Sequence, residues 1–578
     1  MSVQLGVEPP SGPASARLGD RARYRWLRFS TEPNPLWMRE MRQSTRLLRT
    51  PIILLLLTVL LTLLMSAIGG LMTGSYRPND IGAALFHTFF SLAYFVVMIV
   101  GPALAANSIA SERDGRTWEA LLLTGMRPEA IARGKVMSAY TAIALYIVML
   151  APVGALSFLF GGVGPLEVML AFAMLFVFAV QAVCFGLAVS AKMDSLRAAL
   201  LVTLLVAMPA SAVSFVSFGV GGAQLAHELW PTVDRFPVWY PAALVRAPFD
   251  WRYFVFLVLG PAALVGLSTW LFYEITKSNL TSVTDDRSFG LKRWHIATGA
   301  ALVLLGSIAV VVADSSDIST LAITVMTLFG LFVTSGVSLF QGEELGPSRR
   351  VQALLAHAGR LRRSLAPGVL PALRMQALVA FGGLAALLGV SLAVLRAKSP
   401  PDAHEQTARV LLFLASWSGT LGFFLGLGAM LRSRATSAGP PRVTLSVVSF
   451  LLTAAPWVLA AMTGIFTRGS GAAMAIAAPS PLFVYFVGLP SLAPGKEPAL
   501  VVATLCAAAV YGALGLGLAF MATTRCRAVI ATHASLLADA DRRLAAEDAE
   551  ALMYEAQREA QARAAAADAP EADGDAPA

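Results

Sequence analysis

Charged residues are scarce in this chain. Of its 578 residues 14% are charged and 57% are hydrophobic, whereas a soluble globular domain carries about 25% charged residues. This balance excludes an ordinary soluble protein and places the chain in the membrane class.

Cysteine is also rare, and no metal-binding pattern accompanies it. Cys184, Cys506 and Cys526 show neither paired spacing nor the Cys/His clustering that a zinc site needs. The stretch "AHELW" at 226–230 begins like a zinc-protease helix, but Pro231 stands where the second histidine belongs. We therefore expect no disulfide framework and no metal site.

The phosphate-binding loop of nucleotide hydrolases is missing. Gly134-Lys135 and Gly495-Lys496 are followed by Val and Glu, not by the Ser or Thr of that motif. We expect no catalytic residue and no bound cofactor in this chain.

The sequence also lacks the combination of aromatic and basic residues that forms a nucleic-acid-binding platform, so the net charge of +9 does not indicate nucleic acid. Basic residues that flank apolar spans meet anionic lipid headgroups instead.

Long apolar runs are what the sequence does contain. A helix that crosses the hydrocarbon core needs about 20 apolar residues, and the sequence predicts an all-α polytopic membrane protein with about twelve such helices. The expected spans are 52–71, 82–108, 136–160, 166–190, 197–219, 252–273, 296–313, 318–341, 372–395, 408–431, 443–465 and 499–522.

The distribution of basic residues predicts the topology. The first 50 residues hold nine arginines and no apolar signal region, so we expect the first span to direct insertion. Lys and Arg concentrate on cytoplasmic loops, and most of the 44 fall there when both termini are cytoplasmic. The even number of spans agrees with this.

The spans repeat with a nearly constant offset. Spans seven to twelve begin about 244, 236, 236, 242, 246 and 247 residues after spans one to six, which indicates a duplicated six-span unit. The predicted organisation is a disordered basic N-terminal tail (1–32), an amphipathic helix (33–50), a first six-span half (51–275), a cytoplasmic linker (276–295), a second, divergent half (296–524) and a cytoplasmic helical or disordered tail (525–578).

Two external loops echo each other: "FPVWYPAALVRAPF" at 236–249 and "APSPLFVYFVGLP" at 478–490. Both are too apolar for free loops and too short to cross a membrane twice. We interpret them as helices that dip back into the outer leaflet under cover of the surrounding protein. The alternative is a pair of aromatic anchors that lie at the interface.

A polar island, "SERDGRTWEALLLTGMRPEAIARGK" at 111–135, separates two apolar runs. Thr117 is placed to cap a short helix, Gly125 to stop it and Pro128 to open the next. Trp118, Leu121 and Leu122 form an apolar edge on a helix too short to be stable alone, so it must pack against something. A surface loop that only anchors the topology is the plainer interpretation.

An amphipathic segment, "NPLWMREMRQSTRLLRTP", precedes the first span. Arg39, Arg42, Arg46 and Arg49 share one helical face, and Trp37, Met41 and Leu48 share another. Asn34 suits the cap and Pro35 the first turn, and Pro51 is expected to end the helix. This segment should lie along the inner leaflet.

Both segments resemble parts of the type-2 ABC exporter permease family. The polar island is similar to that family's coupling helix, which docks on an ATP-hydrolysing subunit, and the amphipathic segment is similar to its elbow helix. The resemblance implies coupling residues at Glu112, Arg113, Gly115, Thr117, Trp118, Glu119, Leu121, Leu122, Leu123, Gly134 and Lys135, and elbow residues at Asn34, Pro35, Trp37, Arg39, Glu40, Arg42 and Arg46.

The second half departs from the pattern. Its equivalent loop, 341–364, keeps Glu343, Glu344 and a short apolar helix but loses the Thr-Glu-Leu-Leu-Leu core. The contact of this loop with an ATPase is therefore in question.

The resemblance implies a permease subunit of an ATP-binding cassette exporter in the inner membrane of a bacterium. Two separate ATPase subunits would bind ATP and magnesium, and membrane lipids would surround the chain. A further permease or periplasmic partner is left open, and nucleic acid is not expected.

Two other functions remain as alternatives. One is a membrane scaffold on a permease-like fold. The other is an ion-coupled transporter, which usually carries ionisable residues inside its spans. Here His87 is the one clear candidate inside a span, and Glu167 and Glu274 lie near span ends, so this alternative is disfavoured. The expected transport path is lined by Ala, Leu, Gly and Phe, and these residues do not indicate which substrate is moved.

Overall fold

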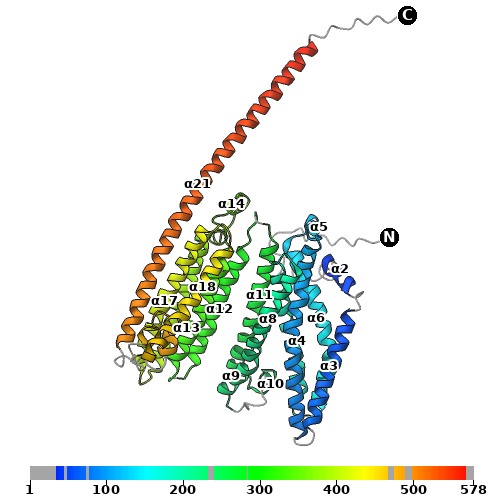
Figure 1. The fold of residues 1–578 in the computed structure, drawn as a ribbon, viewed down its shortest axis with the longest axis vertical. Helices are drawn as coiled ribbons and strands as arrows, with labels where there is room; N and C mark the ends of the chain where they lie inside the picture. The colour runs from blue at the N-terminus through cyan, green and yellow to red at the C-terminus, as the bar shows by residue number, and fades with distance from the viewer. Residues whose placement is uncertain are drawn as a thin grey trace, which may run out of the picture. The chain divides into compact units, whose positions relative to one another are not determined.

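The computed structural model describes residues 34–44, 49–72, 77–159, 161–231, 240–282, 284–314, 316–466, 474–488 and 498–567. All regular structure in these residues is helical (Figure 1). The chain divides into two compact units, Met1–Leu305 and Gly306–Ala578, and each is described by itself.

The first unit is a bundle whose short helices lie at its two ends. The long helices are α3 (Arg49–Met72), α4 (Pro78–Asp114), α6 (Pro128–Leu159), α7 (Pro165–Ser190), α8 (Leu196–Phe215) and α11 (Gly260–Leu280). One end carries α2 (Pro35–Ser44) and α5 (Trp118–Leu123), and the other carries α9 (Gly222–Leu229) and α10 (Tyr240–Arg246) (Figure 1). Two π-helical segments, η1 (Val216–Gly221) and η2 (Tyr253–Leu259), adjoin α8 and α11.

Helix α12 (Phe289–Val312) runs from the first unit into the second. The second unit continues with α13 (Ile318–Leu339), η3 (Phe340–Gly342), α14 (Arg349–Ala356), α15 (Arg360–Ser364), α16 (Val369–Lys398), α17 (Ala403–Arg434), α18 (Gly439–Phe466), α20 (Phe483–Gly488) and α21 (Pro498–Ala567).

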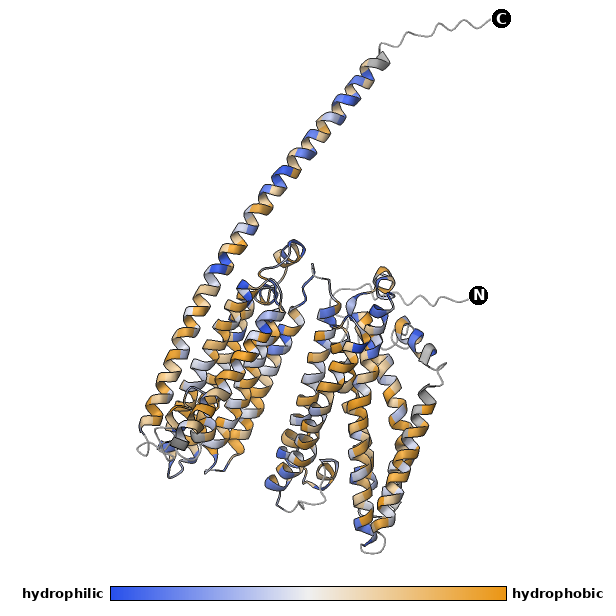
Figure 2. Cartoon of the chain, in the orientation of Figure 1, coloured by the Kyte–Doolittle hydropathy of each residue, from blue (hydrophilic) through white to orange (hydrophobic). Residues whose placement is uncertain are grey.

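Eleven helices within the described residues are long and apolar enough to cross a membrane. The remaining expected span, 52–71, is the first along the chain and lies in α3. Its apolar part, Thr58–Met72, is shorter than the length used to count a candidate span. Apolar residues dominate these bundle helices, whereas polar residues recur along the outer part of α21 (Figure 2). The chain is therefore a multi-pass membrane protein, as the sequence predicts.

Helix α4 forms the centre of the first unit and packs against α6, α7 and α8. Phe86, Phe89 and Phe90 are almost completely buried along it. Small residues allow close approach elsewhere: a Cβ on Gly186 would meet the Pro102 carbonyl oxygen at 2.2 Å. Because lipid tails are as apolar as the helices, such tight packing is a main source of association inside a membrane.

Helix α17 has the same central place in the second unit. It packs closely on α21, where a Cβ on Gly419 would meet the Ala508 carbonyl oxygen at 2.4 Å and one on Gly426 would meet the Gly515 carbonyl oxygen at 2.2 Å. Glycine is required along this seam because the two backbones touch.

The two units pair their helices in the same order. In the first, α4 packs on α7, α4 on α6, α6 on α7, and α7 on α11; in the second, α13 packs on α17, α13 on α16, α16 on α17, and α17 on α21. These are the second, third, fourth and sixth spans of each expected half. The shared pairing agrees with the repeat in the sequence.

Three expected boundaries can be compared with the described helices. Pro51 does not stand at a helix end, because it lies within α3, which is described from Arg49; residues 45–48, between α2 and α3, lie outside the described residues. The expected linker, 276–295, is mostly helical, because α11 extends to Leu280 and α12 begins at Phe289. The expected tail from residue 525 is helical as far as Ala567, and it continues the helix of the last span, because α21 runs unbroken from Pro498 to Ala567.

Each of the two apolar segments that were expected to be external contains a short helix that packs against other parts of the chain. In the first, Tyr240 and Ala243 of α10 are buried, and Arg246 donates from Nε to Glu167 Oε1 at 3.1 Å. In the second, Phe483 of α20 is buried, and Trp457 Nε1 donates to Ser480 Oγ at 3.0 Å. The protein cover agrees with the interpretation as protected helices; residues 236–239 and 489–490 lie outside the described residues.

Candidate functional site

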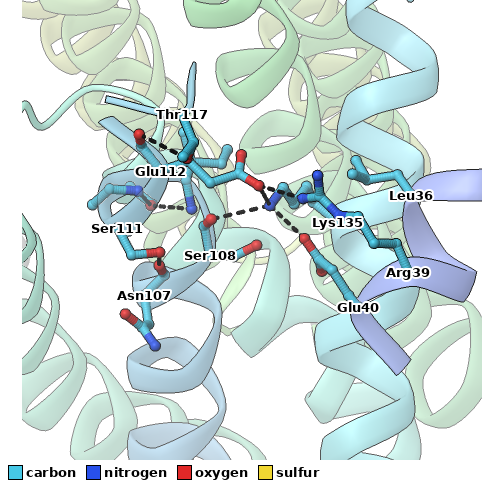
Figure 3. Close-up of polar contacts among 12 residues, drawn as sticks. Leu36, Arg39, Glu40, Asn107, Ser108, Ser111, Glu112, Thr117 and Lys135 are labelled. Carbon is cyan, nitrogen blue, oxygen red and sulfur yellow. Dashed lines mark hydrogen bonds and ion pairs between the residues drawn. The ribbon is translucent and has the colours of Figure 1, made fainter. Parts of the chain in front are cut away.

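The amphipathic helix α2, the end of α4 and the start of α6 meet at Lys135 (Figure 3). The Lys135 side chain is 1% exposed, and its Nζ contacts Glu40 Oε1 and lies 3.0 Å from Glu112 Oε1. The same ammonium donates to the Ser108 carbonyl oxygen at 3.0 Å. One buried cation therefore joins three helices that are far apart in the sequence.

Arg39 adds a second cation to the cluster. Its Nη2 lies 2.6 Å from Glu112 Oε1, so that this carboxylate is shared between Arg39 and Lys135. Two carboxylates and two cations balance in formal charge, which makes burial of Lys135 tolerable because an unpaired buried charge is expensive. We call Arg39, Glu40, Glu112 and Lys135 the polar knot.

Asn34 and Gly134 secure the start of α2 against α6. The Asn34 side chain caps α2 by accepting from Leu36 N at 3.0 Å and donates from Nδ2 to the Ala130 carbonyl oxygen at 2.8 Å. A Cβ on Gly134 would meet Asn34 Oδ1 at 2.8 Å, closer than atoms normally pack. Glycine at this position leaves room for the Asn34 side chain between α2 and α6.

Trp37 contributes a third contact between the same two helices. Its Nε1 donates to Thr141 Oγ1 at 3.3 Å. Pro35 occupies the first turn of α2 as expected, and Arg42 is an exposed residue of that helix. Arg46 lies outside the described residues.

The turn between α4 and α5 is compact. Gly115 follows α4 with φ −79°, so the left-handed residue of this turn is Arg116, with φ 55°. The Thr117 hydroxyl donates to the Glu112 carbonyl oxygen at 3.2 Å, and the Thr117 carbonyl accepts from Leu121 N at 3.2 Å. The hydroxyl thus closes the turn onto α4.

Helix α5 ends as the sequence predicts. Gly125 has φ +68°, a conformation that glycine adopts readily, and Pro128 is the first residue of α6. The short helix is thereby fixed at both ends to the long helices that flank it.

The expected apolar edge of α5 faces the chain's own core. Leu121 is 6% exposed, and Trp118 is half-buried against the same apolar cluster. The Arg113 guanidinium lies over the Trp118 ring, 5.5 Å from its centroid, and donates to the Met193 carbonyl oxygen at 3.2 Å. Burial of this edge against the chain's own core stabilises the loop, because six residues do not form a stable helix alone.

The opposite side of α5 is open. Glu119 and Thr117 are exposed, and Leu123 is 87% exposed. The side chain of Leu122 lies outside the description. The exposed leucine and the carboxylate thus lie on a short helix whose other side is packed on the chain's own core. We call Glu119 and Leu123 the exposed tip.

The corresponding loop of the second unit is built differently. Ser348 caps α14 by accepting from Val351 N at 3.3 Å, and Arg349 Nη2 lies 2.9 Å from Asp541 Oδ1 of α21. The buried Glu343 accepts from Gly368 N at 2.8 Å and therefore serves the fold. Leu354 and Leu361 are the exposed apolar residues of this loop.

The site has no arrangement suited to a metal ion. Within the part of the chain that the structure describes, no group of three or more His, Cys, Asp or Glu side chains is placed to hold one. What the polar knot can do chemically is hold helices together by ion pairs and hydrogen bonds. A force on α5 would then reach α4, α6 and α2 together.

Residues 79–233, which include α4 to α9 and the exposed tip, match the family model of the ABC-2 family transporter proteins. The match covers about a quarter of the chain and shows that this segment is similar to an ABC-2 transporter domain. No curated protein and no solved structure matches the chain. The ABC-2 family is a family of transport permeases, which work with ATP-binding cassette ATPase subunits, so the resemblance seen in the sequence is confirmed for this segment.

Sequence reasoning missed the residues that fix the ABC-2 domain from inside. Ser190 of α7 accepts from Ala110 N at 2.9 Å and donates to the Ala106 carbonyl oxygen at 2.6 Å, tying α7 to the end of α4. A lone serine in an apolar run gives no signal by itself. The pairing of Lys135 with Glu40, 95 residues away, also has no local signal in the sequence.

Proposed function

We propose that the chain is the permease subunit of an ATP-binding cassette exporter in a bacterial cytoplasmic membrane. ATP, with magnesium, would be bound and hydrolysed by separate ATPase subunits, two for the two units of the chain. The ABC-2 match over residues 79–233 and the eleven candidate spans support this function. Both termini would then be cytoplasmic.

One observation carries the proposal: the exposed tip sits on a helix that is locked to the membrane spans. Leu123 is 87% exposed, whereas Leu121, two residues earlier, is 6% exposed. A tip that only anchored the loop to lipid would not need the polar knot behind it. An ATPase that grips Glu119 and Leu123 would move α4 and α6 as one body, because Lys135 of α6 is paired with Glu112 of α4.

The two units would share the work unequally. The first unit offers Leu123 beside Glu119, whereas the second offers Leu354 and Leu361 on a loop rich in arginine. Basic side chains near a membrane surface attract anionic lipid, at about 1 kcal/mol each. We propose that the first loop is the principal ATPase contact.

The test uses the affinity-tagged full chain, purified from its own membranes with bound ATP-binding cassette subunits identified by mass spectrometry. We expect the wild type to retain such a subunit and to display ATP hydrolysis, and the double variant Glu119→Arg, Leu123→Asp to insert normally but lose both. The matched control is Leu354→Asp, which changes an exposed leucine in the corresponding loop of the second unit. A wild type that retains no ATPase would favour the membrane scaffold.

A further inference from the structure

A cavity of about 480 Å³ lies in the second unit between α13, α17 and α18. Sites for small molecules in proteins occupy roughly 300–1,000 Å³, so its size suits a ligand. Its lining consists of Leu331, Thr334, Ser335, Val337, Ser338, Phe424, Leu445, Ser446, Ser449, Phe450 and Thr453. No ionisable side chain belongs to this set.

Hydroxyl groups line two facing walls of the cavity. On α13 the lining residues Leu331, Thr334, Ser335 and Ser338 are spaced i, i+3, i+4 and i+7, which is one face of a helix. On α18 the residues Ser446, Ser449, Phe450 and Thr453 repeat the same spacing. Each face presents three hydroxyls. This regularity is what a polar binding surface needs and what lipid-facing helices lack.

The hydrogen bonds of these hydroxyls set the polarity of the cavity. Thr334 donates to the Leu331 carbonyl at 2.9 Å, Ser335 to the Phe332 carbonyl at 2.7 Å and Thr453 to the Ser449 carbonyl at 2.8 Å. A hydroxyl that donates to its own helix keeps lone pairs with which it accepts. These three hydroxyls, which lie on both walls, therefore favour a ligand that donates hydrogen bonds.

The remaining lining gives the ligand an apolar part as well. Phe424 and Leu445 are buried, and Phe450 is 70% exposed at the rim. Aromatic and aliphatic surfaces of this kind pack against hydrocarbon. The lining contains no cation or carboxylate, and the neighbouring Arg442 guanidinium already donates to the Ser338 and Leu339 carbonyls at 3.2 and 3.3 Å. A charged ligand would therefore lose its hydration without gaining a partner in the lining.

The first unit fills the same place with side chains. At the repeat offset of about 236 residues, Thr334 and Ser335 correspond to Met98 and Ile99. There α4 and α8, the counterparts of α13 and α18, pack directly on each other, with the Tyr94 and Phe215 rings 5.6 Å apart. The hydroxyl-lined cavity is thus a property of the second unit and not of the repeated fold.

We propose that this cavity binds an uncharged amphiphile whose polar part donates hydrogen bonds, such as a glycosylated or amide-bearing alkyl chain. If the chain is an exporter as proposed above, this is the class of its cargo. Binding itself does not depend on an ATPase. A divergent half that has a doubtful ATPase contact would then supply the substrate selectivity of the protein.

The test measures binding of an octyl glucoside with a photoreactive alkyl chain to the full chain in nanodiscs without nucleotide. We expect labelling on α13 and α18, competed by unlabelled octyl glucoside and not by octyl sulfate or octyltrimethylammonium. Thr334→Val with Ser449→Ala should weaken binding about tenfold, since each lost hydrogen bond accounts for a several-fold change. Ser446→Phe, which fills the cavity, should abolish specific labelling.

The matched control is Thr324→Val with Thr444→Val. These hydroxyls lie on the same two helices and make the same type of bond to their own helix, at 2.8 and 3.0 Å, but do not line the cavity. Binding in the control should equal that of the wild type. Equal competition by the charged octyl compounds, or an unchanged affinity in both cavity variants, would overturn the proposal. Because no ATPase is present, either result leaves the coupling function to be judged separately.

Discussion

The ammonium of Lys135 on α6 lies 3.0 Å from Glu112 Oε1 at the end of α4, and it also contacts Glu40 of α2. This relationship makes the loop that contains α5, the two long helices that flank it and the amphipathic helix α2 a single mechanical unit. Removal of the cation would leave two carboxylates close together without their shared partner.

We therefore predict that Lys135→Met destabilises the protein strongly. Breaking a buried ion pair from one side costs roughly 3–5 kcal/mol, and we expect the lower end because the Glu40 and Glu112 side chains are 16% and 14% exposed. Thermal unfolding in detergent measures the effect. Arg133→Met, an exposed cation two residues earlier on the same helix, is the control and should change little. Equal shifts of the unfolding temperature in both variants would mean that the ion pairs of the polar knot do not contribute to stability.

A second prediction concerns the contact of α2 with α6. In Gly134→Val, the new Cβ would lie 2.8 Å from Asn34 Oδ1 and displace the Asn34 side chain, which would weaken both the cap of α2 and its hydrogen bond to α6. The expected result is faster proteolysis in the segment around α2. Gly266→Val, in the middle of α11, meets nothing within 4 Å and serves as the control. Unchanged protection of α2 in Gly134→Val would show that this contact does not hold the helix.

The third prediction separates the two sides of α5. Trp118→Ala should lower stability by less than the roughly 3–5 kcal/mol of a fully buried aromatic, because Trp118 is half-buried against the core. Leu123→Ala should leave stability unchanged, because that side chain is 87% exposed, and should weaken ATPase retention. Paired unfolding and co-purification measurements distinguish the roles. Loss of stability in Leu123→Ala would place this leucine in the fold instead.

The continuous helix α21 leads to a fourth prediction. Arg349 of the second loop pairs with Asp541 of α21 at 2.9 Å, and both side chains are more than half exposed. An exposed pair contributes about 0.2–1 kcal/mol, so Arg349→Glu alone should loosen the outer part of α21 only slightly. Adding Asp541→Arg should restore the contact. Protease sensitivity of residues 536–545 reports this. No rescue in the double variant would mean that the pair plays no part.

Local patterns predicted much of this fold. Apolar run length located the spans, and Asn34, Gly125 and Pro128 marked helix ends because capping and turn preferences act within a few residues. The tail after the last span was predicted as helical or disordered, because its Ala-rich, mixed-charge sequence is typical both of a helix and of a solvated tail. Its length became clear only in three dimensions.

The candidate site was predictable in its location and not in its orientation. Trp118 and Leu121 stand out as apolar residues in a polar loop, and a one-dimensional pattern does not say whether they face a partner or the chain's own core. The hydroxyls of α13 and α18 were overlooked for a related reason. Single Ser and Thr residues are common in apolar helices, and only the packing of α13 beside α18 brings Thr334, Ser335 and Ser449 to one cavity.

The central claim is that Glu119 and Leu123 transmit the work of an ATPase to the membrane spans. Its most direct test is retention of an ATP-binding cassette subunit by the purified full chain, compared between the wild type, Glu119→Arg with Leu123→Asp, and Leu354→Asp. The account predicts that the subunit and its ATP hydrolysis are lost in the first variant and largely kept in the second. Equal retention by all three proteins, with normal insertion, would contradict it.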